Sequence, residues 1–185
     1  MALPLKFTLV TALLLLAACR SDPIQFHTLT PTQVGDHSRT TVGVIQIETL
    51  SVPPQVDRAQ IVVREGNSGL AILETHWWGA TLVDELNSAL ADQLSNSPVH
   101  GKYSLRVDVQ RFDSVPGQYA LMDVKWRLRS ADTGDKARVI CRSTLQTPAG
   151  ASIDELVLAQ QNNIKRLAAM ISQAATRPQA SCPSS

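Results

Sequence analysis

Three consecutive segments in the second half of the chain alternate between apolar and polar residues. From Tyr103 to Asp113, one face carries Leu105, Val107 and Val109, and polar side chains occupy the other. The alternation continues through Ala120, Met122, Val124, Trp126 and Leu128, and then through Ala137, Val139, Cys141 and Leu145. A period of two predicts strands with one buried face, and the turns at Gly117 and at 132–135 predict an antiparallel meander.

Two other segments show the period of a helix. Between Trp78 and Asn96 an apolar residue recurs every four positions, at Leu82, Leu86, Leu90 and Leu94. This spacing predicts a helix with one apolar face. Ser152 and Glu155 have the spacing of a capping box, which predicts the start of a second helix that extends to about Ala175.

Shorter apolar segments precede the first helix. Residues 24–30 and 41–49 predict strands, and residues 66–69 predict the turn of a hairpin between residues 59–65 and 70–74. The order of elements predicts an α+β fold, with a mostly antiparallel sheet and two main helices packed on one face. We expect residues 41–175 to form a single α+β domain.

The first 18 residues predict export rather than a place in the fold. They contain one cation, Lys6, and an apolar run from Phe7 to Leu16 that is too short to span a bilayer and is typical of a signal peptide. The run ends at Leu16-Ala17-Ala18-Cys19, which resembles the lipobox of bacterial lipoproteins, where the cysteine is lipidated. The alternative is an ordinary secretory signal that happens to end in a cysteine.

Lipidation of Cys19 would hold the chain on a membrane, because each buried methylene contributes about 0.8 kcal/mol and several acyl chains bind stably. In Gram-negative lipoproteins an aspartate directly after the cysteine is a retention signal for the inner membrane. This chain has Arg20 there, and Asp22 comes later, which favours the periplasmic face of the outer membrane. We expect a signal peptide over residues 1–18, a lipidated N-terminus and tether over 19–40, and a C-terminal tail over 176–185.

Composition narrows the possible functions. Only Lys6 of the 17 Lys and Arg lies in the signal peptide, so 16 cations remain against 16 Asp and Glu. This balance does not indicate the clustered basic face of a nucleic-acid binder. The four histidines, His27, His37, His76 and His100, are scattered, and no nucleophile, metalloprotease or phosphate-loop motif is present. We expect no catalytic residue, no metal site and no cofactor.

The two remaining cysteines, Cys141 and Cys182, would lie in an oxidising compartment where disulfides persist. A disulfide between them would fasten the C-terminal tail to a strand of the domain. The alternative is a buried thiol at Cys141 and a free thiol at Cys182. The pair lacks the Cys-x-x-Cys spacing of redox proteins.

Residues 53–64, Pro-Pro-Gln-Val-Asp-Arg-Ala-Gln-Ile-Val-Val-Arg, resemble the signature of the PqiC-like family, the lipoprotein auxiliary components of ABC-type and MCE-type transport systems. The resemblance continues through Trp77-Trp78, taken as the opening of the first helix, then residues 106–113, Ala120-Leu121 and Trp126, and covers about Phe26 to Ser172. It implies a non-enzymatic subunit that works with an inner-membrane permease and a periplasm-spanning MCE-domain protein in moving lipid or other hydrophobic molecules between membranes. Homo-oligomers are a further expectation.

Six residues are candidates for contact with a partner: Asp57, Arg58, Gln60, Arg64, Trp77 and Trp78. Asp57 and Arg58 follow a double proline and could present fixed charges, or could satisfy the local backbone and each other. Gln60 and Arg64 could extend that surface, or could be the solvated face of a strand. Adjacent tryptophans in a helix point about 100° apart, so we expect one of the pair in the core and leave open whether the other is exposed.

Three further possibilities remain, one for a contact site and two for the function. Arg111 to Asp113 end a strand and could meet a partner, although ordinary solvation of a strand end is the favoured interpretation. The chain could also be a carrier that encloses an acyl chain itself, which would require an apolar pocket of several hundred cubic ångströms. A purely structural envelope lipoprotein without a transport partner is a third, weaker possibility.

Overall fold

The computed structural model describes residues 22–32, 43–95, 97–131, 139–177 and 181–183. The predicted signal peptide and Cys19 lie outside these residues. The elements, in chain order, are β1 (Gln25–His27), β2 (Gly43–Ser51), β3 (Gln60–Glu65), β4 (Gly69–Trp78), α2 (Leu82–Ser95), β5 (Gly101–Val115), β6 (Tyr119–Ser130), β7 (Val139–Pro148) and α3 (Ile153–Thr176). No helix in the described part is long and apolar enough to cross a membrane.

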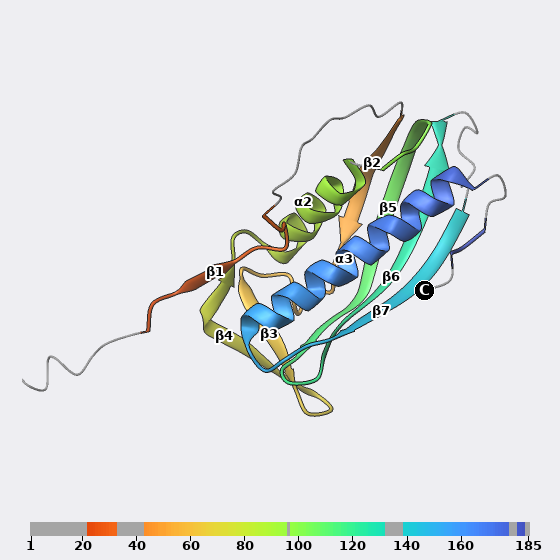
Figure 1. The fold of residues 1–185 in the computed structure, drawn as a ribbon. Coiled ribbons are helices and arrows are strands. Elements are labelled where there is room, and N and C mark those ends of the chain that lie inside the picture. The colour runs from red at the N-terminus through yellow and green to blue at the C-terminus, as the bar shows by residue number, and fades with distance from the viewer. Residues whose placement is uncertain (1–21, 33–42, 96, 132–138, 178–180, 184–185) are drawn as a thin grey trace, which may run out of the picture.

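The strands form two sheets, one in the order β1-β4-β3 and the other in the order β2-β5-β6-β7. Helices α2 and α3 lie side by side on one face of the four-stranded sheet (Figure 1). The side chains that point toward them are buried, including Leu105, Val107, Met122, Trp126 and Leu145. Burial of each large apolar side chain stabilises the fold by roughly 1.5–3 kcal/mol. Most of the core therefore lies between the two helices and one face of the four-stranded sheet.

The predicted α+β class is confirmed, and so is the antiparallel meander, which is β5-β6-β7. The strands pair mostly antiparallel, as predicted, but they form two sheets instead of one, and each sheet also contains one parallel pair. β1 pairs with β4 in parallel, and β2 pairs with β5 in parallel. These pairings join segments that are far apart in sequence, which local periodicity does not reveal.

The assignment of Trp77-Trp78 to the start of the first helix is wrong. Both residues end strand β4, where Trp78 N–H donates to the carbonyl of Ala59 at 2.6 Å. Helix α2 begins at Leu82, and Thr81 caps it by accepting from Asp84 N–H at 3.4 Å. A strand alternates its side chains, so one tryptophan is still buried: Trp78 is 3% exposed, whereas Trp77 keeps partial exposure.

Helix α3 begins at the predicted capping box, in which Ser152 accepts from Glu155 N–H and the Glu155 carboxylate accepts from Ser152 N–H. Two amide side chains on its apolar face, Gln160 and Asn163, are fully buried. Gln160 donates to the carbonyl of Asp113 at 3.1 Å, and Asn163 donates to the carbonyl of Ala120 at 3.0 Å. These bonds satisfy buried polar groups only when α3 lies in one position along the sheet, so they fix its register.

The N-terminal strand β1 is held by three elements. Its ladder partner is the end of β4, from His76 to Trp78. Glu85 on α2 accepts from Leu29 N–H and from Thr28 Oγ1, both at 2.8 Å. Gln161 on α3 donates to the carbonyl of Thr28 at 3.0 Å. The first described segment is therefore fastened to the body of the domain.

The C-terminal segment is joined to the sheet by a disulfide between Cys141 on β7 and Cys182, with the Cα atoms 5.6 Å apart. Cys141 is buried among core residues, and Cys182 is exposed. The bridge closes a loop over a sequence separation of 41 residues, which restricts the unfolded chain more than the folded one.

We expect Cys182→Ser to lower the free energy of unfolding by about 3–4 kcal/mol, the loop-closure value for a bridge of this span. The variant leaves buried Cys141 in place, so the core keeps its packing. Urea unfolding under non-reducing conditions measures the difference, and wild-type protein with reductant should reach the same value. A variant as stable as the oxidised wild type would contradict the prediction.

Candidate interaction surface

The face of the four-stranded sheet that points away from the helices carries most of the cations of the described chain. Its side chains alternate with the buried ones along each strand, as the period of two requires. Seven cations lie on this outer face: Lys102, Arg106, Arg111, Lys125, Arg127, Arg129 and Arg142. Four anions accompany them: Glu48, Asp108, Asp113 and Asp123. The near-zero net charge of the sequence did not reveal this separation of charge.

The strand register places cations directly opposite one another. Arg106 faces Arg127 across β5 and β6, and Lys125 faces Arg142 across β6 and β7. Like charges opposite each other destabilise a sheet pair. Asp108 lies opposite Lys125 on the β5 side, and Glu48 and Asp123 pair with Arg106 and Arg142, so this repulsion is partly compensated within the fold. Between these residues and the exposed side chain of Ile140 lies an open hollow of about 430 Å³.

Part of the charge on this face is neutralised within the fold. Glu48 on β2 accepts from Arg106 Nε at 2.9 Å and contacts Arg129 at 3.4 Å. The hydrogen bond from Arg106 lowers the pKa of the Glu48 carboxyl. Lys125 and Arg127, in the middle of the face, are both exposed. The face therefore combines internal ion pairs at one end with exposed cations at its centre.

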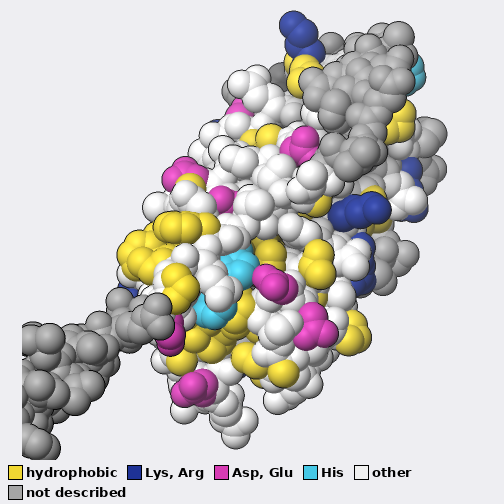
Figure 2. Space-filling model, turned by 60° about the vertical axis from the view of Figure 1, so that its left-hand side comes forward, with side chains coloured by type: hydrophobic (Ala, Val, Ile, Leu, Met, Phe, Trp, Pro, Cys, Tyr) yellow, Lys and Arg dark blue, Asp and Glu magenta, His cyan; other side chains and the backbone are white. Residues whose placement is uncertain are grey.

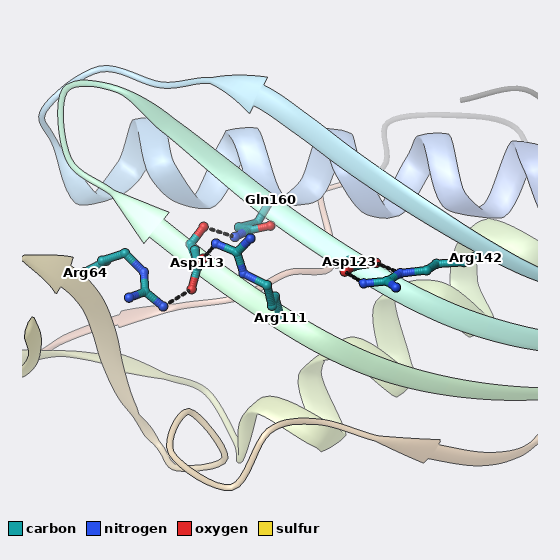
Figure 3. Close-up of polar contacts among 6 residues, drawn as sticks. All are labelled: Arg64, Arg111, Asp113, Asp123, Arg142 and Gln160. Atoms are coloured by element: carbon teal, nitrogen blue, oxygen red, sulfur yellow. Dashed lines mark hydrogen bonds and ion pairs between the residues drawn. The ribbon is translucent and has the colours of Figure 1, made fainter. Parts of the chain in front are cut away.

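At the other end of β5, two arginines hold one buried carboxylate. Arg64 on β3 donates to Asp113 Oδ1 at 2.7 Å, and Arg111 donates to Asp113 Oδ2 (Figure 3). Asp113 is only 6% exposed, and the hydrogen bond between them raises the pKa of Arg64. A buried carboxylate is stable only when it is paired, so this contact ties the three-stranded sheet to the four-stranded one.

A second buried carboxylate, Asp123 on β6, accepts hydrogen bonds from two guanidinium nitrogens of Arg142 on β7, with the Nε at 2.9 Å from Oδ1 (Figure 3). These hydrogen bonds lower the pKa of Asp123, and the charge of Arg111 acts in the same direction. Arginines and aspartates thus alternate across the end of the sheet formed by the C-terminal part of β5 and the N-terminal part of β6. The arrangement fixes the positions of Arg111 and Arg142 at the edge of the exposed cationic region.

The residues expected to contact a partner do not form one surface. Asp57 accepts from Val83 N–H at 3.3 Å at the start of α2, and its side chain is exposed. Arg58 is half-buried, and its Nε has no hydrogen-bond partner among the described residues. Gln60 lies opposite Trp77 in the β3–β4 ladder. Asp57, Arg58, Gln60 and the tryptophans thus share one end of the hairpin, separate from Arg64.

The sequence pattern did not single out Asp123 or Arg142, and it favoured ordinary solvation for Asp113. That interpretation of Asp113 is wrong, because its side chain is buried between two arginines. Both aspartates stand in the polar phase of an alternating strand, where solvent contact is the default expectation. The available signal was the excess of arginine in that phase at 106, 111, 127, 129 and 142.

Neither of two further hollows in the described residues encloses an apolar chamber. One, of about 490 Å³, opens to solvent and is lined mainly by polar residues of α3 and the segment at Pro31 and Thr32. The other, of about 310 Å³, is bordered by Glu48, Lys102 and Arg129. Their polar linings do not fit an acyl chain, for which a closed apolar pocket is needed. Within the described residues, no group of three or more His, Cys, Asp or Glu could hold a metal ion.

Comparison with known sequences gives one family. The model described as "ABC-type transport auxiliary lipoprotein component" matches residues 27–172. No curated protein matches the chain significantly.

Comparison with solved structures shows the same fold in distant sequences. A crystal structure of an uncharacterized protein superposes with a TM-score of 0.64 at 15% identity, covering 82% of this chain and 98% of the other. A protein from Xanthomonas campestris superposes with a TM-score of 0.63 at 16% identity, covering 82% of this chain and 93% of the other. At these identities the likeness establishes the fold.

The pairing of the buried Asp123 carboxylate with Arg142 predicts how stability changes in acid. Because the folded state lowers the pKa of Asp123, the pair stabilises the fold above the unfolded value of about 3.9 and loses that contribution as the pH falls below it. We expect Asp123→Asn to lower the free energy of unfolding by about 1–3 kcal/mol at neutral pH. The difference from wild type should shrink as the pH falls below about 4. Urea unfolding across this pH range measures it. Asp22→Asn, at an exposed aspartate, is the control, and a difference that does not depend on pH would refute the assignment.

Proposed function

Because the chain belongs to the family of ABC-type transport auxiliary lipoprotein components, we propose that it is a non-enzymatic accessory subunit of an MCE/ABC-type system that moves lipids between membranes. In this proposal the subunit is anchored to the periplasmic face of the outer membrane and supports the integrity of the envelope. It docks onto a periplasm-spanning MCE-domain protein, which connects it to an inner-membrane permease. The observation that carries the proposal is the family match, which extends over almost all of the described chain.

Anchoring is assigned to Cys19 by the lipobox-like sequence Leu16-Ala17-Ala18-Cys19. Arg20 in place of an aspartate supports the outer membrane as the destination. The lipid supplies residence at the membrane, and the folded domain supplies specificity for the partner. In this mechanism the subunit holds the partner at the membrane and aligns it, and the chain catalyses no chemical step.

We place the docking surface on the outer face of the four-stranded sheet. Its central cations, Lys125 and Arg127, are exposed. The like charge of Arg106 lies opposite Arg127, and Lys125 lies between Arg142 and Asp108. An acidic segment of the partner would relieve this repulsion, and complementary charge gives specificity and fast association. Asp57 and Arg58 form a second, smaller candidate surface. Self-association of the subunit around the end of the partner is part of the same proposal.

The anchor is tested by Cys19→Ala in cells that express the full chain. We expect wild-type protein in the outer-membrane fraction of a density gradient and the variant in the soluble periplasmic fraction, because a chain without acyl groups loses its membrane affinity. Mass spectrometry of the mature N-terminus checks that wild type carries lipid on Cys19. Equal membrane association of the two proteins would reject Cys19 as the anchor.

The docking surface is tested by mild crosslinking in the native envelope, affinity purification and mass spectrometry. We expect wild type to capture an MCE-domain protein, and Lys125→Glu/Arg127→Glu to capture at least about tenfold less, since charge reversal at an interface turns attraction into repulsion. Lys165→Glu/Arg166→Glu on α3 changes charge equally and should capture as wild type does. Loss of capture in Asp57→Ala/Arg58→Ala alone would move the docking surface to that second site.

A further inference from the structure

Strand β1 and the end of β4 expose an apolar surface that the docking function does not use. Phe26 is 67% exposed and Ile24 is 47% exposed. The Phe26 ring meets Trp77 edge to face, with centroids 6.4 Å apart and planes inclined by 74°. Phe26 and Trp77 are paired in the ladder and point to the same side. We call Ile24, Phe26 and Trp77 the N-terminal apolar patch.

The patch is held rigidly although it lies at the start of the described chain. Leu29 N–H donates to the Glu85 carboxylate and Gln161 donates to the carbonyl of Thr28, and these two hydrogen bonds fasten the segment directly after β1. On the inner side of the strand, His27 Nε2 meets His76 Nδ1 at 3.0 Å. Two aromatic rings and an isoleucine are thus presented on a fixed backbone.

The sequence places this patch next to the proposed lipid anchor. Ile24 follows Cys19 by five positions and Phe26 follows it by seven. An extended chain spans at most about 3.6 Å per residue, so Ile24 lies within roughly 18 Å of the anchored cysteine and Phe26 within roughly 25 Å. Polar headgroups on each side of a bilayer occupy only about 5–8 Å, so a chain anchored at Cys19 keeps the patch close to the membrane surface.

Charge around the patch points to the kind of membrane contact. The acidic residues on or beside these strands are Asp22, Glu74 and Asp154, the last in contact with His27 at 3.3 Å. Asp57 and the half-buried Arg58 lie at the same end of the hairpin, so the acidic residues outnumber the cation there. Figure 2 shows hydrophobic, acidic and His side chains over the lower part of this face, while most of the Lys and Arg side chains lie toward its right-hand edge. Acidic neighbours would repel anionic lipid, so contact must come from the apolar side chains.

We propose that Ile24, Phe26 and Trp77 insert into the headgroup region of the membrane that holds the anchor, and that they favour zwitterionic over anionic lipid. Aromatic side chains with a polar tip favour this zone, and Trp77 Nε1–H donates to the carbonyl of Glu74 at 2.9 Å, so the ring enters with its polar atom already satisfied. The inference rests on the proposed anchoring at Cys19. Anchor and patch together fix the orientation of the domain on the membrane.

Tryptophan fluorescence tests this directly. The chain has three tryptophans, and Trp78 and Trp126 are 3% and 1% exposed, so a quencher in the lipid reaches mainly Trp77. The lipidated mature chain is reconstituted in vesicles of zwitterionic phosphatidylcholine brominated near the carbonyl end of the acyl chain. We expect the Trp77 contribution to fall about twofold relative to unbrominated vesicles, because the indole lies in the interface. Trp77→Phe removes this response.

Matched variants locate the contact. Phe26→Ser should reduce the quenching, whereas Ile140→Ser, at a residue 62% exposed on the other sheet, should leave it unchanged. Replacing part of the lipid by brominated phosphatidylglycerol should not increase it. Circular dichroism checks that each variant is folded. The comparison of brominated with unbrominated vesicles for the wild type tests the proposal even if a variant does not fold.

The outcomes separate the patch from the anchor. A chain that floats with vesicles but shows no quenching, with Trp77 still open to aqueous acrylamide, overturns the patch and leaves the anchor intact. Shielding of Trp77 from both quenchers shows that a second copy of the chain covers it, which also overturns the proposal. Failure of the chain to float overturns the anchoring on which patch and proposed function both depend.

Discussion

The four-stranded sheet is covered by helices on one face, and the candidate interaction surface depends on that asymmetry. Helices α2 and α3 bury the apolar phase of each strand, with Trp126 and Leu105 near the centre. The polar phase must then face outward, and it brings together cations that are dispersed along the sequence. Gln160 and Asn163 fix the position of α3 along the sheet. Because both helices pack on the apolar face, they leave the charged face uncovered.

Local pattern was sufficient for most of the fold. The period of two predicted the meander, and the capping box at Ser152 gave the start of α3, because both signals depend on neighbouring residues alone. The helix containing Leu86 and Leu90 was also predicted, but its start was placed too early: the ladder of β4 continues through Trp78, and the cap at Thr81 was not recognised. Division of the strands into two sheets could not be predicted, since the parallel pairings depend on long-range packing.

The charged site was harder to predict than the fold. Alternation identifies which residues share a face, but it does not say how deeply a polar face is buried. Asp113 became buried because Arg64 arrives from the other sheet, and Asp123 because Arg142 closes over it from the next strand. Both depend on tertiary contacts that composition does not encode. Net charge was uninformative for a related reason, since cations gathered on one sheet face balance anions spread over the rest of the chain.

If the proposed anchor and partner hold the domain between them, the parallel pairing of β1 with β4 has a mechanical consequence. Tension from the anchor would enter at the start of β1 and run along the strand, so it would load the cross-strand hydrogen bonds together in shear instead of opening them one after another. The bonds of Glu85 and Gln161 lie just beyond the strand and would share that load with both helices. A strand of three residues can in this way transmit force into the whole domain.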